Sequence, residues 1–247
     1  MSRPAETASA PSLERVLGLV YRASTSRDAL FGVWHLWLDD ELQAEATRRA
    51  ADSMQRVSVT RTDTWGEPRD GASTTATTIA VWRDREGRLR EERFDPDGAL
   101  LSVVVRGRSH WHRIDGERVV TEESAGGETV YLPPWALTPL PLLSVLELED
   151  AASEQAYGEV EAVYVRAAIR PPQRPDPTYL MLGAADSVEL AFESSGGVVA
   201  RTTLAADGRP YLDLTLRVVD YGREPPTALV DDDFVSLLGP EDRLRLA

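Results

Sequence analysis

The residues best suited to hold a metal ion are His110 and His112, which flank Trp111 in the stretch SHWHRI. Imidazole is a common zinc ligand, and alternate side chains of a β-strand point to the same face. A third imidazole would have to come from His35, the one other histidine. No supporting carboxylate is evident nearby, so we favour the simpler interpretation of two partly exposed histidines with Trp111 in the core. We expect neither a metal nor a cofactor.

Paired carboxylates are abundant, as in Glu91-Glu92, Glu122-Glu123 and Asp231 to Asp233. General acid catalysis needs a carboxyl group that is desolvated in a cleft, whereas most pairs in a chain with 41 acidic residues belong to solvated faces. The sequence contains no phosphate-binding glycine loop, no G-x-S-x-G and no H-E-x-x-H. We therefore expect no catalytic residues and no enzyme activity.

Large aromatic residues lie on or beside the segments that look like strands. Such side chains usually fill the core of a β protein, and this is the simplest interpretation for most of them. Those on a concave sheet face would instead line a cavity for an apolar ligand. The candidate ligand-binding residues are Trp34, Trp37, Trp82, Trp111, Trp135 and Phe192.

Composition limits the partners. The formal charge of −14 disfavours nucleic acid, because phosphate binding needs a concentrated basic patch. No run of 18 apolar residues is present, so no transmembrane segment is expected. The chain has no cysteine, and its first twelve residues are polar and small rather than a signal-peptide core. These features favour a cytoplasmic protein.

Two helices and a strand are predicted near the start. Ser12 is a good N-cap for a helix over 12–24, whose apolar residues recur at helical spacing. Residues 31–40 alternate as a strand that is apolar on both faces, so both faces should be covered. Asp40 is the expected cap of a second helix, which carries Ala46 and Ala50 on its apolar stripe.

From residue 75 the period changes to two, which predicts short strands joined by hairpin turns. The pairs Glu86-Gly87, Asp97-Gly98, Arg106-Gly107, Asp115-Gly116 and Asp207-Gly208 supply residues that tolerate positive φ. Four prolines interrupt the pattern between 133 and 141, where we predict a loop and then a short helix over 139–146. Strands resume at residue 157, and 171–177 is predicted to be a loop. The pattern indicates one large antiparallel sheet.

The order of these segments resembles the LolA-type lipoprotein-carrier superfamily, particularly its actinobacterial members. The resemblance rests on VWRDREGRLREERFD, VVVRGRSHWHRID, LTPLPLLSVLELE and DSVELAFESSGGVVARTTLAADGRPYLDLTLRVVDYG, and it extends from about residue 12 to 235. It implies an α+β fold in which a large curved antiparallel sheet forms a half-open β-barrel, with helices packed on the concave face. Carriers of this kind receive acyl chains in an apolar cavity.

We therefore expect a disordered tail over 1–11, a single half-barrel domain over 12–235 and a C-terminal tail over 236–247. The favoured function is non-enzymatic binding of a hydrophobic or lipid-like ligand in the half-barrel cavity. The alternative is a protein-interaction or regulatory module that uses the sheet surface without a ligand. The expected partners are accordingly a hydrophobic small molecule or lipid, or another protein.

Overall fold

The computed structural model describes residues 12–53, 74–106, 110–115, 118–123, 131–172, 176–183, 185–226 and 236–239, with 110–115 and 118–123 described by their backbone. Within these residues eleven strands form one antiparallel sheet in the order β6-β5-β4-β3-β2-β1-β11-β10-β9-β8-β7. The strands are β1 (Leu30–Asp39), β2 (Thr74–Arg83), β3 (Leu89–Phe94), β4 (Leu100–Arg106), β5 (His110–Asp115), β6 (Arg118–Glu123), β7 (Leu146–Tyr157), β8 (Val160–Ile169), β9 (Ser187–Glu193), β10 (Val199–Ala206) and β11 (Arg209–Tyr221).

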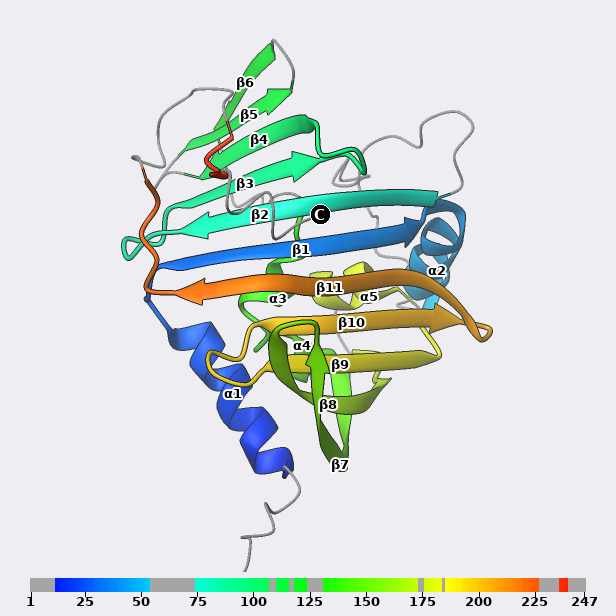
Figure 1. Ribbon diagram of the computed structural model, residues 1–247. Coiled ribbons are helices and arrows are strands. Elements are labelled where there is room, and N and C mark those ends of the chain that lie inside the picture. The colour runs from blue at the N-terminus through cyan, green and yellow to red at the C-terminus, as the bar shows by residue number, and fades with distance from the viewer. Residues whose placement is uncertain are drawn as a thin grey trace, which may run out of the picture.

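Two meanders meet at the centre of this sheet. Strands β1 to β6 run outward in chain order, β7 to β11 run back inward, and the long strands β1 and β11 join the two halves (Figure 1). Strands β6 and β7 lie at opposite ends of the order and do not pair, so the sheet is not closed. The architecture is therefore an α+β half-barrel, and the fold class expected from the sequence is confirmed.

Five helices are described: α1 (Leu13–Thr25), α2 (Asp40–Ser53), α3 (Pro134–Leu137), α4 (Leu142–Val145) and α5 (Pro177–Leu182). Figure 1 shows α3, α4 and α5 on the far side of the sheet. The expected first helix is confirmed, and its N-cap is Ser12, whose Oγ accepts a hydrogen bond from the backbone N–H of Arg15. Among the described residues, no helix combines the length and apolar character needed to cross a membrane.

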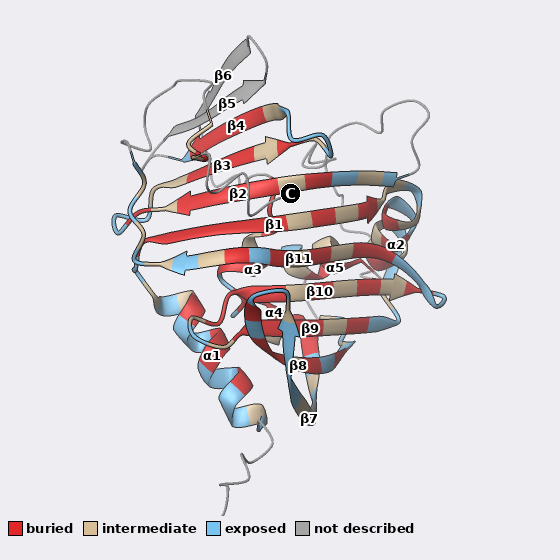
Figure 2. Cartoon of the chain, viewed as in Figure 1, coloured by how far each residue is buried: buried red, intermediate tan, exposed pale blue. Residues whose placement is uncertain are grey.

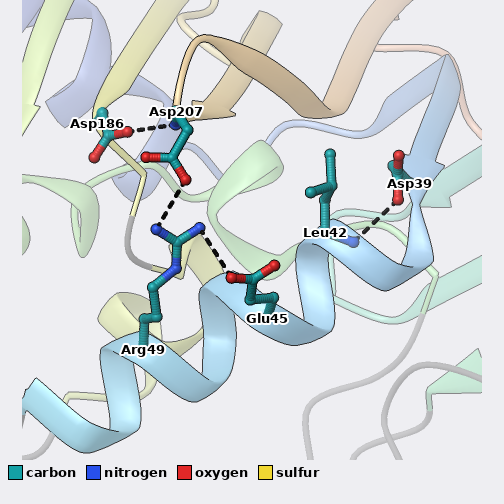
Figure 3. A network of polar contacts seen from close by, with 6 residues as sticks. All are labelled: Asp39, Leu42, Glu45, Arg49, Asp186 and Asp207. Carbon is teal, nitrogen blue, oxygen red and sulfur yellow. Dashed lines mark hydrogen bonds and ion pairs between the residues drawn. The ribbon is translucent and has the colours of Figure 1, made fainter.

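Helix α2 is anchored at both ends by carboxylates (Figure 3). At its start, Asp39 rather than the expected Asp40 satisfies a free backbone donor, because Asp39 Oδ1 accepts from the N–H of Leu42 at 3.0 Å. Toward its end, Arg49 pairs with Asp207 at 3.2 Å in the β10–β11 turn. The predicted Asp207-Gly208 turn is confirmed, with positive φ at both residues.

The sheet has a core on each face. On one face of β1, Trp34, Leu36 and Leu38 belong to the main core, to which all five helices also contribute residues. We call this the helix face. The other, which we call the second face, carries Phe31 and Val33 into a smaller cluster. Figure 2 shows that β1 is buried along most of its length. The prediction that both faces of this strand are covered is confirmed for its first half, whereas His35 and Trp37 on the second face are only partly buried.

The proline-rich middle and the region after β8 depart from expectation. The predicted helix over 139–146 is limited to α4, and α3 forms where a loop was predicted. Strand β7 was not predicted, although Leu146 and Leu148 alternate with glutamates there. The expected loop over 171–177 leads directly into α5, where Asp176 Oδ1 accepts from the N–H of Thr178 at 2.8 Å and Pro177 opens the helix.

Residues 236–239, expected to belong to a C-terminal tail, contact the second face of the sheet. The N–H of Leu237 donates to Glu92 Oε1 at 2.8 Å, and the Oγ of Ser236 donates to Glu92 Oε2 at 2.7 Å. The side chain of Leu238 is buried in the smaller cluster. The expected 1–11 tail and the Asp231 to Asp233 run lie outside the described residues.

Candidate functional site

An open groove of about 350 Å³ lies on the second face, where β2, β1 and β11 run side by side. Its apolar lining includes Trp37, Ala76 and Pro96, and its polar lining includes His35 and Arg217. The remaining lining residues are Leu36, Thr77, Thr78, Asp213 and Thr215. Pockets of this size and mixed chemistry are typical of sites for small ligands or for one end of a larger ligand.

The strand register places these side chains together. His35 lies opposite Thr78 on β2 and opposite Thr215 on β11. Two residues along, Trp37 lies opposite Ala76 and Asp213. Because alternate residues of a strand share a face, both cross-strand rows lie on the second face and form the floor of the groove.

Arg217 lies on the same face, two residues beyond Thr215 on β11. The β1–β11 register shifts at this point, so that Val33 pairs with Val218, Trp34 pairs with Leu216 and Arg217 has no partner on β1. The Nε of Arg217 donates to His35 Nδ1 at 3.2 Å.

This hydrogen bond determines which form of His35 is present. Burial lowers the pKa of His35, and the neighbouring positive charge of Arg217 lowers it further, so the ring is neutral at pH 7. Since Nδ1 accepts from Arg217, the proton of the neutral ring is on Nε2. The Nε2 atom is buried and has no hydrogen-bond partner among the described residues. The ring is therefore held in one neutral tautomer whose Nε2–H lies inside the protein and is not exposed to the groove.

The single carboxylate that lines the groove is already engaged. Asp213 accepts hydrogen bonds from Arg201 Nη2 at 2.9 Å, from Thr203 Oγ1 at 3.0 Å and from Thr215 Oγ1 at 2.9 Å. By contrast, the terminal nitrogens of Arg217 make no bond to the described residues. The charged group of the groove that keeps free donors is thus Arg217, which favours a hydrogen-bond acceptor or an anion.

The sequence-predicted ligand residues lie on both faces of the sheet. Trp34, Trp135 and Phe192 belong to the core on the helix face and are at most 2% exposed. The indole N–H of Trp34 donates to the carbonyl oxygen of Val199 at 3.0 Å, which satisfies its polar atom inside that core. These three aromatics pack tightly with their neighbours.

The other three predicted aromatics are distributed differently. Trp82 is fully buried on the second face, with its ring centroid 4.3 Å from that of Phe31. Trp37 lines the groove. Trp111 lies in β5, where the structure describes the backbone alone. Of the five predicted residues whose side chains the structure describes, only Trp37 lines the groove.

Sequence reasoning missed Asp213 and Arg217. A signal for them was present, because Asp213, Thr215 and Arg217 follow one another at every second position of a strand. This spacing predicts a polar row on one sheet face. This polar row contains no aromatic residue, and aromatic character alone defines the ligand-site candidates in the sequence.

The proposed three-histidine metal site is excluded by topology. Strand β5, which carries His110 and His112, is four strands from β1 in the sheet order. At about 4.8 Å between neighbouring strands, His35 is roughly 19 Å away from them. Within the part of the chain that the structure describes, no cluster of three His, Cys, Asp or Glu side chains suits a metal ion.

The Glu91-Glu92 pair is not a solvated face, contrary to expectation, because both side chains are at most 3% exposed. Glu91 points to the helix face, where its Oε2 accepts from the N–H of Tyr131 at 3.0 Å and of Leu132 at 3.3 Å. Desolvation raises the pKa of Glu91 to about 7, although the two backbone N–H groups oppose the shift. Glu91 thus fixes the backbone just before α3, and its buried carboxylate is not accessible to a substrate.

No family model matches the chain, and no curated protein sequence does. Among solved structures, LprF from Mycobacterium bovis is 13% identical with a TM-score of 0.43, and the alignment covers 90% of this chain and 99% of LprF. An uncharacterized conserved protein from Thermus thermophilus is 10% identical with a TM-score of 0.43, covering 84% of this chain and 86% of that protein.

The LolA superfamily protein NE2245 from Nitrosomonas europaea is also similar, at 7% identity and a TM-score of 0.34, covering 88% of this chain and 96% of that one. With all TM-scores below 0.5, these structures say nothing about what this chain binds.

Proposed function

We propose that this chain is a non-enzymatic binding protein for a hydrophobic or lipid-like small molecule, and that the groove receives the polar end of that molecule. One observation carries the proposal: the indole of Trp37 lines the same groove as Arg217 and the His35 ring. A site for an amphiphile needs an apolar surface beside a few placed polar groups.

The available chemistry favours binding over catalysis. A general base must be free to accept a proton from the substrate, but Asp213 already accepts three hydrogen bonds. His35 is neutral, and the nitrogen that could accept a proton is occupied by Arg217. The groove can therefore orient an anionic or acceptor group, and it offers no base for a reaction.

Octanoate is a suitable first probe, because it combines a carboxylate with a short apolar chain. We expect octanoate to bind in calorimetry and to shift the NMR signals of the His35 ring. Arg217→Gln should weaken binding about tenfold, the scale expected when one charge-assisted hydrogen bond is lost. Arg166→Gln is the matched control, since Arg166 is also exposed but lies on β8. An unperturbed His35 ring at saturating octanoate would contradict the groove as the site.

A second candidate function, a protein-interaction module, is favoured by an exposed apolar patch. Leu17 and Tyr21 lie one turn apart on α1 and are 42% and 64% exposed. Leu140, 44% exposed, is brought beside α1 because its N–H donates to Ser24 Oγ at 2.9 Å. If the patch binds a second copy of the chain, light scattering should show a dimer that Tyr21→Glu abolishes. A monomer at all concentrations would exclude that role.

A further inference from the structure

The sheet face that bears the groove continues along β1 into the apolar cluster of the second face. Going from His35 toward the start of β1, the next residues on this face are Val33 and Phe31, which pair with Ala80 and Trp82 on β2. The distance from His35 to Phe31 is four residues, about 14 Å of strand. The surface thus changes along one line from polar at His35 to fully apolar at Phe31.

The apolar end of this line is covered by residues 236–239, which we call the strap. Leu238 is 5% exposed and belongs to the same cluster as Phe31, Val33, Trp82 and Val218. The strap contains neither helix nor strand. A leucine side chain from a distant part of the chain therefore packs into the apolar cluster that includes Val33, the residue two positions before His35 on this face.

Glu92 holds the strap in place. Its Oε2 accepts from Ser236 Oγ at 2.7 Å, and its Oε1 accepts both from the N–H of Leu237 at 2.8 Å and from Arg90 Nε at 2.9 Å. Glu92 and Arg90 are at most 1% exposed. If the strap leaves, Glu92 keeps its ion pair with Arg90, and water can replace the two lost donors.

We infer that Leu238 occupies the place of the apolar chain of a bound amphiphile, so that the strap is a displaceable cover over the second half of the ligand site. This inference rests on the proposed function, because the head group must be held in the groove. Replacing Leu238 by an acyl chain keeps Phe31 and Trp82 buried, so the exchange loses little apolar contact.

The ligand class follows from the two halves of the site. The terminal nitrogens of Arg217 favour an anionic head group, a carboxylate or a phosphate, and Asp213 is neutralised by its own donors. The cluster accepts one apolar chain along β1. The ligand is therefore a single-chain anionic amphiphile whose chain is long enough to pass Val33 and reach the position of Leu238.

Chain length provides the test. Affinities are measured by calorimetry for octanoate, hexadecanoate and hexadecyl phosphate, below their micelle thresholds. Leu238→Ala should tighten binding of the long probes about tenfold, because the apparent affinity rises with the fraction of molecules whose site is open. Octanoate should bind equally to both proteins. Leu140→Ala, which removes an exposed leucine near α1, is the matched control and should change neither affinity.

The two long anionic probes distinguish the sources of the head group. Tighter binding of hexadecanoate assigns a carboxylate, and tighter binding of hexadecyl phosphate assigns a phosphate. Hexadecyltrimethylammonium carries the same chain on a cation and should not bind. Binding of this cation as tightly as hexadecanoate would overturn the anionic head group.

Hydrogen exchange on the unmodified protein reports the strap directly. The N–H of Leu237 is bonded to Glu92, so its exchange should accelerate when hexadecanoate binds and stay slow when octanoate binds. If hexadecanoate binds while Leu237 stays protected, the strap inference is overturned and the proposed function stands. If neither octanoate nor the long probes bind, the proposed function fails and the inference fails with it.

Discussion

Arg217 of β11 donates from Nε to Nδ1 of His35 on β1 at 3.2 Å, and this contact organises the groove on the second face. It exists because His35 pairs with Thr215, and Arg217 follows two residues further along β11 on the same face. The bond fixes the tautomer of the ring, and it leaves the terminal guanidinium nitrogens available to a ligand.

The pKa of His35 should lie below its ordinary value of 6.5, because burial and then the charge of Arg217 disfavour the imidazolium. The lowered pKa means that the stability His35 contributes is present above pH 6.5 and is lost as pH falls through the folded-state pKa. An NMR titration of the ring measures it. Arg217→Gln should raise this pKa without restoring it fully, since burial remains. A ring that titrates at 6.5 in the unmodified protein would contradict the assignment.

Glu91 should make the protein less stable as pH rises from about 4.5 to about 7, because desolvation raises its pKa to about 7 in the folded state. The shift from 4.5 to about 7 corresponds to roughly 3 kcal/mol of unfolding free energy. Glu91→Gln should remove this dependence and leave the protein more stable than the unmodified chain at pH 8. Urea unfolding at pH 5 and pH 8 tests both points, and equal pH dependence in the two proteins would refute them.

Breaking the buried ion pair Arg90–Glu92 should cost far more unfolding free energy than breaking a surface pair. Glu92→Ala removes the carboxylate beside a guanidinium that is 1% exposed, and we expect a loss of about 3 kcal/mol in unfolding free energy. The control is Glu224→Ala, which breaks the exposed pair with Arg85 and should cost less than about 1 kcal/mol. Chemical denaturation gives both values. Similar losses for the two variants would mean that burial does not set the cost.

Gly197 should be intolerant of a side chain for a reason beyond its φ of +83°. An added Cβ would meet the carbonyl oxygen of Leu19 in α1, so Gly197→Ala must displace the helix or the loop. Gly98 has a φ of +81° and open space around it, so Gly98→Ala measures the backbone cost alone, about 1 kcal/mol. We expect Gly197→Ala to cost at least about 2 kcal/mol more in unfolding free energy. Equal costs would show that the contact with α1 relaxes freely.

Several parts of the fold were readable in the sequence because they depend on local preferences. Ser12 at the start of α1, the double-faced apolar strand β1 and the Asp207-Gly208 turn each follow from a few neighbouring residues. Strand β7 and helix α5 were missed, since proline-rich surroundings obscured the Leu146–Leu148 alternation and the Asp176-Pro177 helix start. In both cases the local pattern for a strand or a helix was present, but the neighbouring prolines gave a stronger signal for a loop.

By itself, the sequence determined that the chain forms one large antiparallel sheet with helices, because period-two patterning and turn residues act over short distances. Period two also placed Trp34 and Trp37 on opposite faces of the strand over 31–40, but it did not determine which face carries a groove, since that depends on what covers each side. Only the tertiary structure placed Arg217 beside His35, because the β1–β11 pairing joins residues 182 positions apart. The same long-range packing brought Leu238 into one cluster with Phe31, so the candidate site was decided by contacts that no local pattern encodes.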